Sequence, residues 1–475
     1  MTKKTKLPLL EMPIWKALLI LSIPIVITNM LQVAYQFADA YWVGRLWHDG
    51  VATVTVAGMI IFLTISLWSW LSIAGSILIA QYFGAKNEKM VNHTAAQTLL
   101  MILLTSSFLW WLWYIFTPQI VSLIWVDTTI FAQTVEYIRI SFIGVIFSFS
   151  FFMFQSIMRW IGKPNVPIFI VWLTVLINFL LNPVFIFGFW NFEWLWVIWA
   201  AITTVVSQAI AAFIGFSMLL SGKYGIHLHI KDFIPDTKAI KKSFFLWLPS
   251  SIEMTARSGS YALLVVIVTM FGTLALAWFG VAGNIIQFII IFSMWLSMAT
   301  SVLVGQSIWA GFIQKAKEIN KISAWISFIL LTLLGWVAFL FAPYFIWFFV
   351  PGEEEVIKIW TEIVRISALF FGLIWIQMSL NGVLRAIGKT QIPMFITILW
   401  QWVIKLPLAY VLAHYTSLWM QWIWWSEPIT SIIICIVMFV IISKVDWSKS
   451  NMTKEEQTEK QIIEESIIEE PIKEF

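Results

Sequence analysis

The sequence predicts an all-α integral membrane protein with twelve transmembrane helices, arranged as two pseudo-symmetric six-helix bundles. Of its 475 residues, 60% are hydrophobic and only 11% are charged, whereas a soluble domain is about 25% charged. Apolar runs of about 20 residues, each long enough to cross a bilayer, recur as far as residue 443. The second part of the chain also repeats the residue pattern of the first.

The apolar runs define the expected helices in chain order. The first run follows several lysines but continues as a full-length span without a small-residue cleavage site, so we expect an uncleaved helix and not a signal peptide. The predicted spans are 15–38, 51–82, 94–116, 134–158, 166–188, 195–220, 243–270, 276–305, 322–347, 361–384, 392–413 and 419–443.

An internal repeat relates the two parts of the chain. The stretch RWIGKPNVPIFI (159–170) recurs as RAIGKTQIPMFI (385–396) at an offset of 226, and Pro24 and Gln81 recur as Pro249 and Gln306 at an offset of 225. An even number of spans in each half gives both halves the same orientation in the membrane. The predicted parts are an N-terminal lobe (1–220), a cytoplasmic linker (221–242), a C-terminal lobe (243–443) and a charged cytoplasmic tail (444–475).

The distribution of lysine and arginine predicts the orientation. Connections that contain Lys86, Arg159, Lys315 and Lys389 are basic, and the alternate connections hold few cations. We therefore expect a multi-pass protein of the inner or plasma membrane with both termini in the cytoplasm. The net charge of +4 follows from this asymmetry and indicates no nucleic-acid partner. The single cysteine, Cys435, excludes an internal disulfide.

Four sequence stretches resemble one family of transporters. They are LSIPIVITNMLQVAYQFADAYWVGRL (21–46), QYFGAKN (81–87), MRWIGKPNVP (158–167) with its second copy LRAIGKTQIP (384–393), and LINFLLNPVFIFG (176–188). Together they resemble the multidrug and toxic compound extrusion (MATE) family over residues 12–443.

The resemblance implies a function. Members of this family export amphipathic, often cationic compounds by alternating access, coupled to the inward movement of H⁺ or Na⁺. We accordingly expect small amphipathic organic substrates, contact with membrane lipids, a monomer, and no cofactor apart from the coupling ion. We expect no enzymatic activity, because no convergent set of a nucleophile with a base, or of metal ligands, is evident in the sequence.

Asp39 is the first candidate residue for coupling. It lies in an otherwise uncharged run within the first predicted span, and an ionisable side chain inside a membrane is costly and is usually functional. A structural alternative places it at the hydrated outer end of that helix, close to Arg45. The resemblance favours function, because FADAYWVG (37–44) matches the family's helix-one aspartate.

Further candidates lie on the fifth and sixth spans. Asn178 and Asn182 are four residues apart and share one helix face. The resemblance implies that this face supplies an asparagine and an aspartate and that the sixth helix adds a threonine, which matches Thr204 or, second, Thr203. An amide takes up no proton, so Asn182 argues against a relay of two carboxylates. Na⁺ bound at Asp39 and Asn178 is one interpretation, since hard cations prefer oxygen ligands; structural hydrogen bonds between helices are the other.

The second lobe offers an acid–base pair, and the first offers a hinge. Glu253 and Arg257 are one helical turn apart, a spacing that allows an ion pair within one helix. The resemblance places a cation-binding acid near Glu253, so a functional role and a structural ion pair both stay open. Pro24 lies within the first span, where proline removes a helical hydrogen bond; it is a candidate hinge or a static kink.

Tryptophan occupies several positions where a small residue is expected. Trp309 aligns with Gly84 in the repeat, Trp160 with Ala386, and Trp70 lies where the family tends to have glycine. The chain holds 31 Trp against 22 Gly. One interpretation is a set of true tryptophans, many in an interfacial aromatic belt. The other is that the native protein carries glycine at many of these sites, because its genome reads UGA as glycine.

Two other functions remain open on the sequence alone. A flippase for lipid-linked oligosaccharides has a related architecture, but it would need more intramembrane cations than Arg257 and Lys405 supply. A membrane sensor that binds ligands without transport is the other alternative. The sequence names neither the substrate nor the choice between H⁺ and Na⁺.

Overall fold

The computed structural model describes residues 8–43, 71–123, 128–188, 196–269, 294–349, 354–368, 370–415 and 421–445, with parts of 50–61 and Trp447. Every regular element in these ranges is a helix, as the predicted all-α class requires. Trp68, Trp70, Arg45 and the predicted tail beyond Trp447 lie outside the described residues.

The first half contains seven described helices and a π-helical turn. They are α1 (Pro8–Glu11), α2 (Ile14–Val43), α4 (Leu71–Gly84), α5 (Glu88–Leu123), α6 (Thr128–Trp160), α7 (Val166–Pro183), η1 (Val184–Gly188) and α8 (Trp196–Leu220). The predicted spans at 166–188 and 195–220 agree closely with α7–η1 and α8, whereas α5 and α6 extend beyond the predicted spans at both ends.

The second half repeats this order of helices, but two of its predicted spans are irregular: one is divided into α12 and α13, and the other contains a π-helix. It contains the 3₁₀ turn η3 (Ile230–Phe233), α9 (Thr237–Thr269), the helical segment 294–309, α11 (Ile313–Phe349), α12 (Glu354–Ala368), α13 (Phe371–Ala386), α14 (Gln391–Ile398), the π-helix η4 (Leu399–Lys405), α15 (Leu406–Tyr415) and α16 (Gln421–Lys444). The predicted span at 361–384 is bent by 50° between α12 and α13. The predicted spans at 51–82 and 276–305 lie partly outside the described residues.

Helix length and composition agree with a membrane protein. Seven described helices are long and apolar enough to cross a bilayer, or eight if the bent α12–α13 pair counts as one span. On α11, large apolar side chains are exposed along one face, whereas Ser323 and Ser327 are buried on the other. Such an apolar outer face is stable only against lipid or a partner. The exposed α11 residues include Trp325, Ile329, Leu333, Trp336, Leu340 and Trp347.

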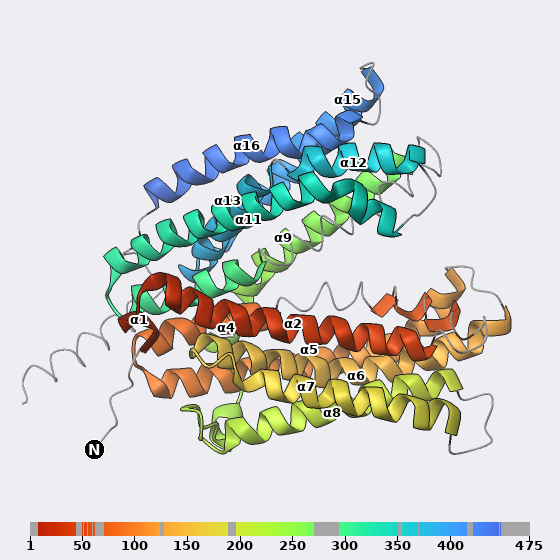
Figure 1. The fold of residues 1–475 in the computed structure, drawn as a ribbon. Coiled ribbons are helices and arrows are strands. Elements are labelled where there is room, and N and C mark those ends of the chain that lie inside the picture. Colours follow the sequence, from red (N-terminus) through yellow and green to blue (C-terminus); the bar gives the residue numbers. More distant parts are fainter. Residues whose placement is uncertain are drawn as a thin grey trace, which may run out of the picture.

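The two halves meet at one end of the molecule. That end, named here the linker end, carries the loops 85–87, 161–165, 310–312 and 387–390 together with the linker 221–236. Among the described residues, the helix pairs that join the halves include α2 with α11, α4 with α9 and α13, and α5 with α9. The halves diverge away from the linker end, where α12 lies far from α2 (Figure 1).

The linker is docked on α5 and is partly helical. α9 begins at Thr237, so the last residues of the predicted linker 221–242 belong to a helix. The Gln97 side chain donates to the carbonyls of Asp232 and Ile234 at 2.7 and 2.6 Å and accepts from the Asp236 amide at 3.0 Å. His93 Nε2 lies 3.0 Å from Asp236 Oδ2. These contacts tie the segment that joins the halves to the first half.

Candidate cation site

Asp39 lies near the end of α2, between α7 and α8. Its Oδ1 accepts a hydrogen bond from Asn182 Nδ2 at 2.7 Å, and its Oδ2 accepts one from Thr204 Oγ1 at 3.3 Å. No lysine, arginine or histidine of the described part of the chain forms an ion pair with it. The carboxyl group of Asp39 is therefore held by neutral hydrogen-bond donors.

The two asparagines predicted to share a helix face do so. Asn178 and Asn182 are both buried on α7, and Asn182 Nδ2 also donates to Asn178 Oδ1 at 3.1 Å. The Asn182 amide nitrogen therefore lies between two oxygen atoms, Asp39 Oδ1 and Asn178 Oδ1. That is where a cation shared by these oxygens would bind.

Both candidate threonines of α8 belong to the site, with different partners. Thr204 contacts Asp39, whereas Thr203 donates its hydroxyl hydrogen bond to Asn182 Oδ1. The sequence prediction ranked Thr204 first on resemblance alone, and neighbouring helix positions point in different directions. Thr203 therefore orients the Asn182 amide, and Thr204 donates to the Asp39 carboxyl group.

Sequence reasoning missed one aromatic residue of the site. The Tyr35 hydroxyl accepts from Asn178 Nδ2 at 3.0 Å. Tyr35 precedes Asp39 by four residues on α2, so it lies on the same helix face. That spacing was the available signal.

Irregular backbone and an apolar cluster border the site. α7 changes to the π-helix η1 directly after Pro183, and π-turns within helices occur often at functional sites. Ile186 of η1 packs with Val197 and Ala200 of α8 in a small buried cluster, against which Trp42 and Tyr137 are placed. Ala200 of this cluster lies one helical turn before Thr203 and Thr204.

The second half has no equivalent of this site. At the repeat offsets of 225 and 226, Leu264 corresponds to Asp39, and Ile404 and Leu408 correspond to Asn178 and Asn182. Each of these three polar side chains is thus replaced by an aliphatic one, so the arrangement of one carboxylate with two asparagines occurs in the first half alone.

The second-lobe candidates form a larger charge cluster than the sequence predicted. The expected pair is present, with Arg257 and Glu253 separated by 3.6 Å, but Arg385 of α13 also lies 3.6 Å from the same carboxylate oxygen. The Glu253 side chain is only 1% exposed. Two guanidinium groups therefore contact one carboxylate oxygen here, whereas neutral side chains donate to Asp39.

The candidate hinge Pro24 lies inside a helix that continues past it. α2 runs from Ile14 to Val43 without a break, and the Thr28 hydroxyl donates to the Pro24 carbonyl at 2.8 Å. A hinge at Pro24 stays a prediction.

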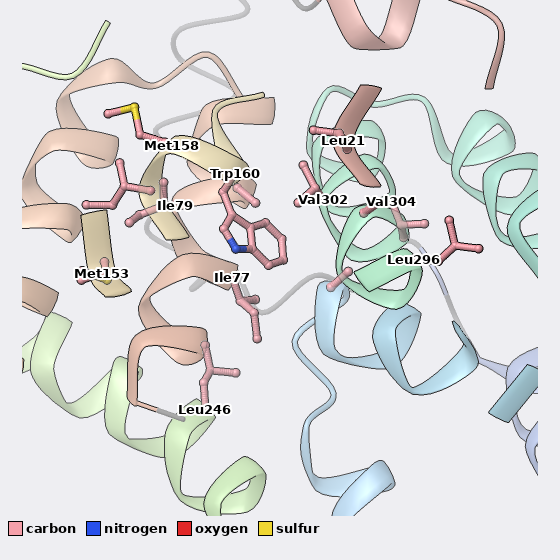
Figure 2. Packing of buried hydrophobic residues seen from close by; sticks show 14 of the residues in the cluster. Leu21, Ile77, Ile79, Met153, Met158, Trp160, Leu246, Leu296, Val302 and Val304 are labelled. Carbon is pink, nitrogen blue, oxygen red and sulfur yellow. The ribbon is translucent and has the colours of Figure 1, made fainter. Parts of the chain in front are cut away.

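The disputed tryptophans lie where the halves pack together. A Cβ at Gly84 would be 2.6 Å from the Gln306 carbonyl oxygen, so glycine allows two backbones to touch there. Its repeat partner Trp309 is buried beside Tyr82, and the indole N–H has no hydrogen-bond partner among the described residues. Trp160 is also buried, with its indole among interface side chains that include Ile77 (Figure 2).

The helical repeat, the apolar outer faces and the half-buried carboxylate of Asp39 among neutral polar side chains together define a multi-pass membrane transporter. The particular family follows from comparison with known proteins. The family model MatE matches residues 24–184 and 249–411, one stretch in each half. The chain therefore belongs to the MatE family of transporters, as the sequence motifs predicted.

Known relatives and structures agree with this assignment. The probable multidrug resistance protein YoeA of Bacillus subtilis (strain 168) is 26% identical over 419 residues, covering 87% of this chain and 90% of the relative. An outward-facing multidrug resistance MATE family transporter of the MOP superfamily has a TM-score of 0.83 at 23% identity, over 92% of this chain and 97% of that one. A MATE in the bent conformation has a TM-score of 0.85 at 22% identity, over 98% and 99% of the two chains.

Proposed function

We propose that this protein exports amphipathic, cationic organic compounds by alternating access, driven by inward movement of H⁺ or Na⁺ through the site at Asp39. The observation that carries the proposal is the hydrogen-bonded set of Asp39, Asn182, Asn178 and Thr204. In the second half, aliphatic residues replace the aspartate and both asparagines. The names of the curated relatives, which describe multidrug resistance, support the substrate class.

The linker end faces the cytoplasm in this proposal. The basic residues Lys86, Lys163, Lys315 and Lys389 lie in or beside its loops, and cytoplasmic loops of membrane proteins carry an excess of lysine and arginine. Both termini are then cytoplasmic. Because the halves join at the linker end and diverge away from it, the structure corresponds to a state open to the outside.

The Asn182 amide offers a way to sense the cation. With its nitrogen towards Asp39 it stabilises the ionised carboxylate. After a half-turn of the amide, its oxygen would face Asp39 Oδ1 and Asn178 Oδ1, where it accepts from a protonated carboxyl or completes an oxygen cage for Na⁺. Thr203, which now donates to Asn182 Oδ1, would then accept from the amide nitrogen. The amide thus presents a donor to the empty site and an acceptor to the occupied one; Asn178 Oδ1 loses its donor in the flip and regains a partner only from a bound Na⁺.

Coupling requires that the cation and the drug favour different states of the transporter. A ligand shifts a conformational equilibrium only by its difference in affinity for the two states. A cation that reorganises the contacts among α2, α7 and α8 alters the packing of the first half and so supplies this difference.

Efflux of a fluorescent cationic dye from proteoliposomes tests the proposal. A Na⁺ gradient and a pH gradient are imposed separately, and wild type is compared with Asp39→Asn. We expect efflux under one gradient, which identifies the ion, and a loss of at least tenfold in the variant. Glu318→Gln makes the same acid-to-amide change at an exposed position of α11 and should transport normally. Transport that is indifferent to Asp39→Asn would refute the site.

A further inference from the structure

Two glutamines related by the repeat connect the halves at the linker end. Gln81 of α4 donates from Nε2 to the Ala386 carbonyl at 3.1 Å, and Gln306 donates from Nε2 to the Trp160 carbonyl at 2.6 Å. Both glutamine side chains are buried. In each case the donor belongs to one half and the acceptor to the other. The two bonds are therefore pseudo-symmetric copies of one contact.

The acceptor carbonyls lie at the C-terminal ends of α6 and α13, where the last carbonyls of a helix have no N–H of that helix to accept from. After α6, Lys163 N donates to the Met158 carbonyl and Gly162 N to the Arg159 carbonyl. Gly162 has a φ of +79°, so this is the glycine-terminated motif that satisfies two of the last helical carbonyls. The next carbonyl, that of Trp160, receives the bond from Gln306.

The second half ends its helix in the same way. Lys389 N donates to the Leu384 carbonyl and Gly388 N to the Arg385 carbonyl, with a φ of +85° at Gly388. The carbonyl of Ala386 follows and receives the bond from Gln81. Each half thus presents a helix-end carbonyl that the opposite half satisfies. A buried carbonyl left without a donor is costly.

The acceptors are backbone atoms, so the contact does not depend on the disputed tryptophan. Whether position 160 carries tryptophan or glycine, its carbonyl stays in place. The close approach of Gly84 to the Gln306 carbonyl oxygen places the two halves in backbone contact beside the Gln306 bond. Separation of the halves at this end must therefore break both glutamine bonds.

We propose that Gln81 and Gln306 form a latch that holds the linker end closed and sets the equilibrium between the outward-open and inward-open states. This rests on the proposed function, because only an alternating-access transporter must open at that end. The latch couples opening to the loss of two buried hydrogen bonds at once. It is not the sole contact there, since Lys242 also donates to the Tyr82 hydroxyl across the halves at 3.1 Å. Loss of the latch therefore shifts the equilibrium between the two states without unfolding the protein.

The test measures the separation of the halves directly. Spin labels are placed at Lys89 and Gln314, which are exposed, repeat-related and on opposite halves, in a background in which the buried Cys435 is replaced by serine. Distances are recorded by double electron–electron resonance in nanodiscs without drug. Gln81→Met and Gln306→Met keep the side-chain length and apolar volume but remove the donor. Each should raise the ratio of the long to the short distance about tenfold, and the double variant about a hundredfold.

Controls separate the latch from a general loss of buried amides. Gln155→Met removes a buried glutamine amide within the first half, whose nitrogen has no hydrogen-bond partner in the part of the chain that the structure describes, and should leave the distances unchanged. Gln306→Leu is a second variant, which also removes the donor to the Trp160 carbonyl and should favour the long distance as Gln306→Met does. An unchanged distribution in the double variant overturns the latch.

The outcomes also distinguish the latch from the function on which it rests. If the distances respond but wild type transports no dye under either gradient, the latch stands and the proposed function fails. If wild type transports the dye and the double variant shows unchanged distances, the latch alone fails.

Discussion

Glu253→Gln removes a carboxylate that lies 3.6 Å from a guanidinium nitrogen of both Arg257 and Arg385. At that distance and an effective dielectric constant of about 20, each pair contributes about 5 kcal/mol of Coulomb attraction before desolvation. The Glu253 side chain is 1% exposed and the arginines are 29% and 18% exposed, so this is not a surface ion pair. Removing one partner of a buried pair costs about 3–5 kcal/mol, because the remaining charge is left uncompensated.

We therefore expect Glu253→Gln to be destabilised by about 3–5 kcal/mol. The thermal midpoint of the purified protein in detergent should fall by roughly 6 °C or more, given about 2–4 °C per kcal/mol for a unit of this size. Fluorescence-detected size-exclusion chromatography after heating measures the shift. The exposed Glu318→Gln serves as the matched control and should move the midpoint by less than 1 °C.

A double variant makes the reasoning sharper. Glu253→Gln with Arg257→Gln restores the net charge of the cluster, because one guanidinium leaves with the carboxylate. It should regain more than half of the lost stability, which is the non-additivity expected of contacting charges. A single variant that melts at the wild-type temperature yet loses transport would refute the reasoning and make Glu253 a cation-binding residue.

Two further predictions concern the linker and the tryptophans. The hydrogen bond with His93 and those from the Lys238 and Ala239 amides hold the pKa of Asp236 below its ordinary value; its stabilising effect is thus present above about pH 4 and lost as the pH falls through the lower folded value. Thermal midpoints should therefore fall less between pH 5 and 3 in Asp236→Asn than in wild type, and identical profiles would contradict this. For the disputed position, we expect the Trp309→Gly chain to be as stable as or more stable than the Trp309 chain, although loss of a well-packed tryptophan costs about 3–5 kcal/mol. Peptide sequencing of the protein from its native cells should find glycine there, and a UGG codon would exclude it.

Much of the candidate site could be predicted from the sequence. Asp39 is conspicuous because a charge in an apolar run is costly, and Asn178 and Asn182 share a face because they are one helical turn apart. Both signals are local, because they depend only on hydropathy and on the periodicity of one helix. The same periodicity places Tyr35 on the helix face of Asp39, but the sequence analysis missed it.

Contacts between distant helices could not be predicted. The bond from Asn182 to Asp39 joins residues 143 positions apart, and the bond from Gln81 to Ala386 joins residues 305 positions apart. The role of Thr203 depends on how α8 is rotated against α7, and the second guanidinium at Glu253 comes from α13. None of these follows from the spacing of residues within one helix.

The sequence by itself determined the helical membrane class, the two-fold repeat and the intramembrane carboxylate of Asp39. The reason is that the bilayer requires each helix separately to be long and apolar. Only the tertiary structure decided that Glu253 is held by two arginines and that Gln81 and Gln306 cross between the halves. The physical reason is that such polar contacts depend on the packing of helices far apart in the chain, where a buried donor and a left-over carbonyl satisfy each other only in the folded molecule.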